Sequence, residues 1–126
     1  MAAAVVLGDA PPAGLDDSKK LCARRRADLE QAIKSTCCWA VGVAEVGEID
    51  AINILQATML AMTRAVSALC EDNGLHVGQV LVDGNLTPQG RCADWRWPVR
   101  AIVGGDGIEP CISAASIIAK EHRDRI

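Results

Sequence analysis

The order of its predicted elements places this chain of 126 residues in the α/β class. Short apolar runs rich in Val and Ile predict strands, and they alternate with longer segments whose apolar residues recur every three or four positions, which predicts helices. The longest of these helical segments has no charged residue from Ala51 to Thr63, so we expect it to pack against a sheet. Strand–helix–strand–helix–strand order is typical of a layered α/β domain.

The first half of the chain is expected to contain two strands and two helices. Residues 2–8 predict a buried strand, and a loop containing Pro and Gly follows it. The Asp-Asp-Ser segment at 16–18 offers an N-cap and negative charge to a helix over 19–34. Residues 37–46 predict the second strand. Residues 48–69, with Ile, Leu, Met and Val at helical spacing, predict the longest helix.

The second half predicts strands at 79–83 and 99–105 and a helix at 113–126 that is basic at its end. An irregular segment with Trp95 and Trp97 separates the two strands. These tryptophans could stack on a nucleic-acid base, but we expect them to pack over the end of the sheet. At 126 residues the chain is expected to be one domain at most, and it is long enough to bury a core.

Composition excludes several classes of protein. The chain has no apolar run of the roughly 18 residues that a membrane span needs, and its first residues lack the basic region of a signal peptide. We therefore expect a cytoplasmic protein without membrane contact. Its six cysteines form no C-x-x-C pair and only two histidines are present, which predicts reduced core thiols and no zinc site.

The net charge of −3 gives no global indication of nucleic-acid binding, but two local clusters are basic. One contains five Lys and Arg residues between Lys19 and Arg26, and the other contains Lys120, Arg123 and Arg125. Such clusters are usually solvated helix faces, although they also suit contacts with phosphates.

Two aspartates follow predicted strands directly. Asp83 ends an apolar run and precedes Gly84, and Asp106 follows the strand at 99–105 and precedes Gly107. If the strands are neighbours, the two carboxylates could share a hard divalent cation such as Mg²⁺ or Mn²⁺, which prefers oxygen ligands. Asp before Gly is also a common turn signal, so both residues could simply belong to turns.

Several ordered motifs resemble those of the ribonuclease HII family. They cover nearly the whole chain and lie at Ala2–Leu7, Leu15–Leu21, Glu48–Asp50, Asn53–Met59, Val82–Asn85, Gly105–Asp106, Ser113–Lys120 and Arg123–Asp124. The resemblance implies an endonuclease that hydrolyses the RNA strand of RNA–DNA hybrids and nicks DNA at embedded ribonucleotides, by metal-assisted phosphodiester hydrolysis. It also implies a ribonuclease H-like mixed sheet flanked by helices.

The resemblance further implies a site of four carboxylates that hold Mn²⁺ or Mg²⁺, with Asp83 and Asp106 as two of the catalytic metal ligands. The other two belong to an Asp-Glu-Ala-Gly-Arg-Gly motif in the family's first strand, which this sequence does not contain. That strand lies at the centre of the family's sheet, so we expect strands 2–8 and 37–46 to be separated from 79–83 and 99–105. The family's C-terminal helices are also missing.

We therefore expect 1–126 to be a partial ribonuclease H-like catalytic domain, an excerpt of a longer enzyme, and inactive by itself. The alternative is a non-catalytic remnant that at most binds nucleic acid through its basic clusters.

By the same resemblance, Ser18, Lys19 and Lys120 are predicted to contact the backbone of the substrate, an RNA–DNA hybrid or DNA with embedded ribonucleotides. A helix cap, a solvated lysine and a basic helix end would explain these residues equally well. We expect the protein to be a monomer.

Overall fold

A computed structural model describes residues 2–8, 12, 14–15, 20–45, 53–74 and 76–125. Along the chain its elements are β1 (Ala2–Val6), α1 (Ala23–Thr36), β2 (Cys38–Gly42), α3 (Ile54–Asn73), β3 (Val80–Asp83), β4 (Val99–Ile102), the 3₁₀ turn η2 (Gly105–Gly107) and α4 (Pro110–Asp124). The predicted α/β class and the order of its elements are confirmed. No helix among the described residues is both long and apolar enough to cross a membrane.

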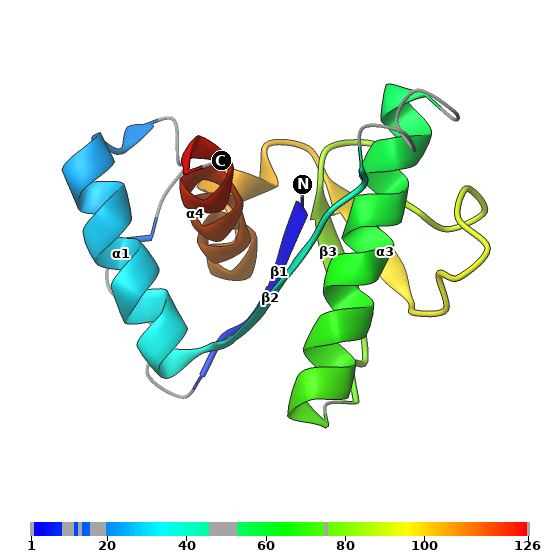
Figure 1. The fold of residues 1–126 in the computed structure, drawn as a ribbon, viewed down its shortest axis with the longest axis horizontal. Coiled ribbons are helices and arrows are strands. Elements are labelled where there is room, and N and C mark those ends of the chain that lie inside the picture. Colours follow the sequence, from blue (N-terminus) through cyan, green and yellow to red (C-terminus); the bar gives the residue numbers. More distant parts are fainter. Residues whose placement is uncertain are drawn as a thin grey trace.

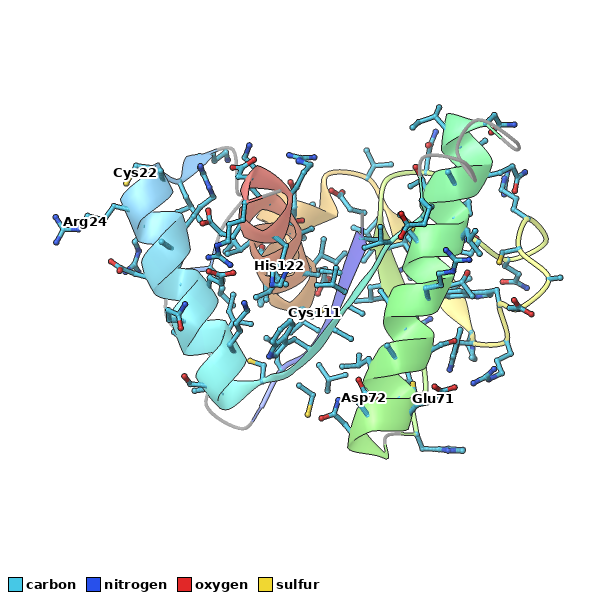
Figure 2. All side chains as sticks on the ribbon, viewed as in Figure 1. Cys22, Arg24, Glu71, Asp72, Cys111 and His122 are labelled. Carbon is cyan, nitrogen blue, oxygen red and sulfur yellow. The ribbon has the colours of Figure 1, made fainter. Side chains whose placement is uncertain are left out.

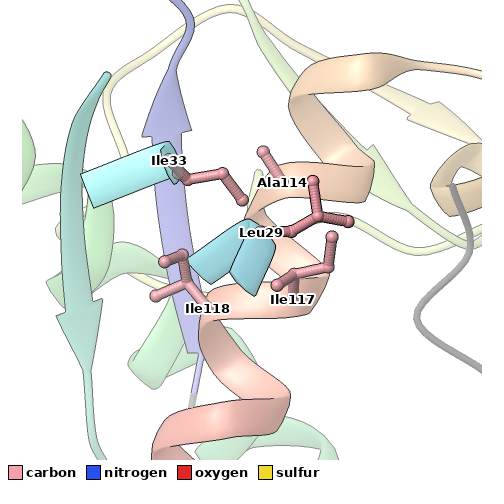
Figure 3. Packing of buried hydrophobic residues seen from close by; sticks show 5 residues of the cluster. All are labelled: Leu29, Ile33, Ala114, Ile117 and Ile118. Atoms are coloured by element: carbon pink, nitrogen blue, oxygen red, sulfur yellow. The ribbon is translucent and has the colours of Figure 1, made fainter. Parts of the chain in front are cut away.

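The first sheet separates two layers of helices. β1 and β2 pair antiparallel from Ala2↔Gly42 to Val6↔Cys38, with α1 and α4 on one face and α3 on the other (Figure 1). Alternate residues of a strand point to opposite faces. Accordingly Ala3, Val5 and Leu7 pack into the α1–α4 core, whereas Ala4 packs on the α3 side. The centre of the α1–α4 core is fully buried and consists of Leu29, Ile33, Ala114, Ile117 and Ile118 (Figure 3).

The second sheet is parallel and pairs β3 with β4 from Val80↔Val99 to Asp83↔Ile102. Trp95 and Trp97 lie next to it, each only 9% exposed, with their rings edge to face and 4.9 Å apart. The indole N–H of Trp95 donates to the carbonyl of Trp97 at 2.9 Å, and Val66 of α3 packs against both rings. The expected packing role is confirmed, and neither buried ring presents a face for a base.

The two sheets are not joined to each other. One contains only β1 and β2 and the other only β3 and β4, so among the described residues no strand lies between β1 and β3. This is the separation that the resemblance to the ribonuclease HII family implies for a sheet without its central strand.

The predicted start of α1 is wrong by four residues. The helix begins at Ala23 with Cys22 as its N-cap, so the segment 16–18 does not cap it, and that segment lies outside the described residues. The first helical hydrogen bond runs from Arg26 N–H to the Cys22 carbonyl at 3.0 Å, and the Arg26 guanidinium donates to the Leu21 carbonyl. Cys22 makes no side-chain capping hydrogen bond, and the Arg26 guanidinium, which is a donor, does not replace an acceptor for the first N–H groups of α1.

The other helices also differ from the prediction at their ends. α4 begins at Pro110 rather than 113, because the first turn of a helix tolerates a residue without an N–H. α3 begins after Asn53, whose side chain accepts from Gln56 N–H, and it ends at Gly74 in the left-handed region. Residues 48–52 of the predicted long helix lie outside the described residues.

We expect Gly42→Ala to destabilise the fold. A Cβ at this position would lie 2.1 Å from the Ala61 carbonyl oxygen and 2.5 Å from Ala65 N, both in the backbone of α3. The helix would have to move away from β2, at an expected loss of about 1–3 kcal/mol in unfolding free energy. Urea unfolding measures it, with Gly78→Ala as the control because nothing lies within 4 Å of its Cβ position. Equal midpoints for the two variants would contradict this close contact.

Candidate functional site

The parallel pairing of β3 and β4 brings the two predicted metal ligands to one edge of the second sheet. Asp83 is the last residue of β3 and pairs in register with Ile102, the last residue of β4. Asp106 lies in η2, four residues further along the chain. The Asp83 carboxylate accepts a hydrogen bond from Gly105 N–H at 3.0 Å, which fastens it to the residue next to Asp106.

The turn that carries Asp106 is held from both sides. Gly104 takes a left-handed conformation (φ 67°), and Gly105 is buried where a Cβ would lie 2.6 Å from the Ile112 side chain. On the other side the buried hydroxyl of Ser113 in α4 donates to the Asp106 carbonyl, with the Glu109 carbonyl also within reach at 3.2 Å. α4 therefore positions the backbone of Asp106.

Sequence reasoning missed Gly105 and Ser113 as positioning residues. The Gly-Gly pair before Asp106 is a visible turn signal. Ser113, in contrast, carries no such signal in the sequence. Only the fold shows that its hydroxyl lies against η2 and donates to the Asp106 carbonyl.

The chemistry of this pair fits a hard divalent cation only in part. Asp83 is exposed and Asp106 is half-buried, so carboxylate oxygens lie at an accessible edge, which suits Mg²⁺ or Mn²⁺. Across the described part of the chain, however, no three His, Cys, Asp or Glu side chains come together as a metal site. The pair could supply two ligands, and a firmly held ion would need further oxygen ligands.

The residues predicted to contact substrate are not gathered at this pair. Ser18 and Lys19 lie outside the described residues. Lys120 is on α4, seven residues beyond Ser113 and so about 10 Å further along the helix axis. It forms an ion pair with Asp124 at 3.4 Å, and both side chains are partly exposed.

Some cations of the first basic cluster are exposed to solvent, and others form ion pairs within the fold. Arg24 is exposed and points away from the molecule at the start of α1 (Figure 2). Arg26 is half-buried and forms an ion pair with Glu121 of α4 at 3.2 Å. Part of the cluster is therefore structural, while Lys20 and Arg24 are exposed.

A second ionised cluster joins α1 to the end of α4 around Glu30, whose side chain is fully buried. Arg125 donates two hydrogen bonds to this carboxylate, and Lys34 Nζ lies 3.1 Å from Oε2. The hydrogen bonds from Arg125 are the main reason that the pKa of Glu30 is lowered. Lys34 is also 4.5 Å from the ring centre of Trp39.

His122 completes this cluster from α4 (Figure 2). Its Nε2 is buried, lies 3.8 Å from Glu30 Oε2 and has no hydrogen-bond partner. Burial lowers the pKa of His122, the charges of Lys34 and Arg125 lower it further, and Glu30 opposes them. Trp39 packs against the imidazole with the ring centres 5.5 Å apart. Sequence reasoning missed this cluster, because 95 residues separate Glu30 from Arg125.

Cys111 is not a candidate nucleophile. Burial, and secondly the nearby Glu109 carboxylate, raise the pKa of its thiol, so the reactive thiolate is scarce at neutral pH.

Comparison with known proteins identifies what the chain is similar to. The family profile described as Ribonuclease HII matches residues 1–126. The ribonuclease HII of Novosphingobium aromaticivorans is 68% identical over 128 residues, which cover 100% of this chain and 65% of that protein. That of Erythrobacter litoralis is 64% identical over 126 residues, covering 100% and 59%. The chain thus spans about three-fifths of the length of these relatives.

A solved structure shares the fold. The structure of a complex of PCNA and ribonuclease HII from Archaeoglobus fulgidus matches 99% of this chain and 67% of the other, with a TM-score of 0.65. Sequence identity to it is 23%, so this likeness supports the ribonuclease H-like arrangement alone.

We expect Glu30→Gln to lower the unfolding free energy by about 1–3 kcal/mol, because a neutral amide leaves Arg125 and Lys34 without their buried counter-charge. Urea unfolding at pH 7 measures the loss. Asp28→Asn removes an exposed acid from the same helix and is the matched control, with an expected change within about 0.5 kcal/mol. Equal effects of the two variants would show that the cluster contributes no stability.

We also expect stability to fall as the pH decreases below about 6.5, the ordinary pKa of histidine. The folded protein binds a proton at His122 more weakly than the unfolded chain, so this contribution is complete above 6.5 and is lost as the pH falls toward the lowered pKa. The loss from Glu30 comes only below its ordinary pKa of 4.5, because its folded pKa is also lowered. Unfolding free energies of wild type and His122→Gln at pH 7 and about 5.5 test this. If His122→Gln loses as much unfolding free energy between pH 7 and about 5.5 as the wild type does, the prediction is wrong.

Proposed function

Because the chain belongs to the ribonuclease HII family, we propose that it forms part of the catalytic domain of an endonuclease. The reaction is hydrolysis of the RNA strand of RNA–DNA hybrids and nicking of DNA at embedded ribonucleotides. The observation that carries the proposal is the carboxylate edge, where Asp83 at the end of β3 accepts from Gly105, the neighbour of Asp106. The proposed compartment is the cytoplasm, and the proposed state is a monomer.

The proposed cofactor is Mn²⁺ or Mg²⁺, with Asp83 and Asp106 as two of its ligands. When bound, such an ion activates water and stabilises charge on a phosphodiester in the transition state. The chain's own contribution is to hold two carboxylates at one sheet edge. Asp83 is positioned by Gly105 N–H, and the backbone of Asp106 is positioned by Ser113.

The proposed substrate is a polyanion, and exposed cations on α1 and α4 support this. Lys20 is exposed three residues before α1, Arg24 is exposed in its first turn, and Arg123 is exposed near the end of α4. Point charges on flexible side chains suit contacts with the phosphate backbone, which orient a duplex without reading its sequence. Ser18, Lys19 and Lys120 remain predicted members of this contact surface.

The test is cleavage of a DNA duplex with one ribonucleotide, in Mn²⁺ and in Mg²⁺. We expect no cleavage by the chain of 126 residues, and cleavage once a strand with the Asp-Glu-Ala-Gly-Arg-Gly motif is joined to its N-terminus. In that extended protein, Asp83→Asn and Asp106→Asn should each reduce the rate by on the order of 10²-fold or more, because each removes a ligand that stabilises transition-state charge.

Asp94→Asn is the matched control, because Asp94 is an exposed aspartate in the segment between β3 and β4, outside the carboxylate pair. Its rate should equal that of the parent. Equal rates for all three variants would reject the metal-ligand assignment. Duplex binding without cleavage, also by the extended protein, would favour the non-catalytic alternative.

A further inference from the structure

The ionised cluster around Glu30 contains a buried polar atom without a partner. This atom is Nε2 of His122, and no group in the described part of the chain hydrogen-bonds to it. It lies 3.8 Å from Glu30 Oε2, which is too far for a hydrogen bond. A shift of either side chain by less than 1 Å toward the other would bring the two atoms within bonding distance. The cluster is therefore built one short step away from a further contact.

The oxygen that His122 faces is already occupied. Arg125 donates from Nη1 to Glu30 Oε2 at 2.8 Å and from Nη2 to Oε1. Lys34 Nζ lies 3.1 Å from the same Oε2. A carboxylate oxygen offers about two lone pairs, and these two cations use both of them. His122 can bond to Oε2 only if one of the cations leaves.

The charges in the cluster also favour an exchange over an addition. The charged groups next to His122 are Glu30 and Lys34 of α1 and Arg125 of α4, and β2 contributes the uncharged ring of Trp39. While His122 is neutral, two cations surround one buried carboxylate. Protonation alone would place three cations there, and like charges at this distance repel one another. Departure of one cation restores the original balance.

Lys34 is the cation that is free to leave. It makes one contact with the carboxylate, its side chain is 21% exposed, and its flexible stem allows the ammonium group to reach water. The Arg125 side chain is more exposed, but two hydrogen bonds to Glu30 hold its guanidinium, and Nη2 lies 4.0 Å from the Glu121 carboxylate. Glu121 is itself paired with Arg26 of α1 at 3.2 Å. The joint between α1 and α4 therefore persists without Lys34.

We propose that His122 and Lys34 exchange places at Glu30 when the pH falls. The protonated imidazole donates from Nε2 to Oε2, and the Lys34 ammonium group moves out into water. Lys34 Nζ also lies 4.5 Å from the ring centre of Trp39, so its departure removes a contact between α1 and β2. Arg125 meanwhile keeps α1 on α4. A single proton thus loosens α1 from the sheet and leaves it fastened to the helix that carries Ser113.

The pH range of the exchange follows from its two acids. Burial, and then the charge of Lys34, lower the pKa of His122, so the exchange occurs below pH 6.5. Glu30 remains ionised through this range, because the hydrogen bonds from Arg125 hold its pKa below the ordinary 4.5. The inference does not depend on the proposed nuclease activity, and its test uses no cleavage assay.

The test is an NMR titration of the chain from pH 7 to about 5. The chain has two histidines and four lysines, so labelling these residue types gives few signals. At pH 7 the ring of Trp39 should displace the methylene signals of Lys34 from those of the exposed Lys20. As His122 becomes protonated, the Lys34 signals should move to the position of Lys20, with the same midpoint as the imidazole signals.

Variants test whether the two side chains compete. In His122→Gln the Lys34 signals should stay in place down to about pH 5, because no proton enters the cluster. Lys34→Met removes one cation and keeps an apolar stem, so His122 should become protonated about one pH unit higher. Lys20→Met, at an exposed lysine outside the cluster, is the matched control and should leave the midpoint of His122 unchanged.

Several results would overturn the proposal. Lys34 signals that stay fixed while His122 becomes protonated would show that the lysine keeps its contact. Equal movement in His122→Gln would show that His122 does not drive it, and an unchanged midpoint in Lys34→Met would show that the two do not compete. A His122 ring that is still neutral at about pH 5 would leave no exchange to occur. Loss of the native indole signals of Trp95 and Trp97 before protonation of His122 would show unfolding in place of exchange.

Discussion

The candidate site depends on the packing of one helix, α4, against β1 and α1. Ile117, Ile118 and Ala114 in the middle of this helix are completely buried in the core with Leu29 and Ile33. Its first turn holds the backbone of Asp106 through Ser113, and its C-terminal residues hold Glu30 through Arg125. A single rigid element thus connects the carboxylate edge to the ionised cluster on α1, and apolar burial at its centre supplies the free energy that keeps both ends in place.

The same helix, together with α3, keeps two small sheets in one molecule. An isolated two-stranded ribbon is marginal in water, so neither sheet is expected to persist without a helix against it. α4 packs on β1 and reaches β3, while α3 packs on β1 and β2 and also meets the Trp95–Trp97 cluster beside β3 and β4. The close approach of Gly42 to the backbone of α3 shows how tightly the first sheet is held. Helix packing, rather than strand pairing, therefore sets the distance between β1 and β3.

The local sequence pattern was sufficient to locate most helices and strands. It was not sufficient to identify which residues of different elements contact one another. β-branched runs located β3 and β4, and the uncharged stretch from Ala51 to Thr63 predicted a helix that packs against a sheet. In α3 Ala57, Met59 and Ala61 are indeed buried. The start of α1 could not be read from the sequence, because its N-cap, Cys22, makes no side-chain capping hydrogen bond, whereas the Asp-Asp-Ser segment at 16–18 carries a capping pattern. The sequence shows for Glu30 only Lys34 one turn later. Only tertiary structure reveals that Arg125 covers it, 95 residues away. Asp83 and Asp106 were recognisable as strand-end residues, but their proximity needed the parallel pairing of β3 with β4.

The two aspartates of the carboxylate edge are held unequally. The backbone of Asp106 is held by the hydroxyl of Ser113 in α4 and by the turn η2, which follows the left-handed Gly104. Asp83 ends β3, and in the described structure its backbone is fixed from the β4 side only. A carboxylate binds an ion best when its supporting backbone is already fixed, because the ion then does not have to order it. If the pair holds a cation as proposed, Asp83 is therefore the ligand whose backbone the ion has to order.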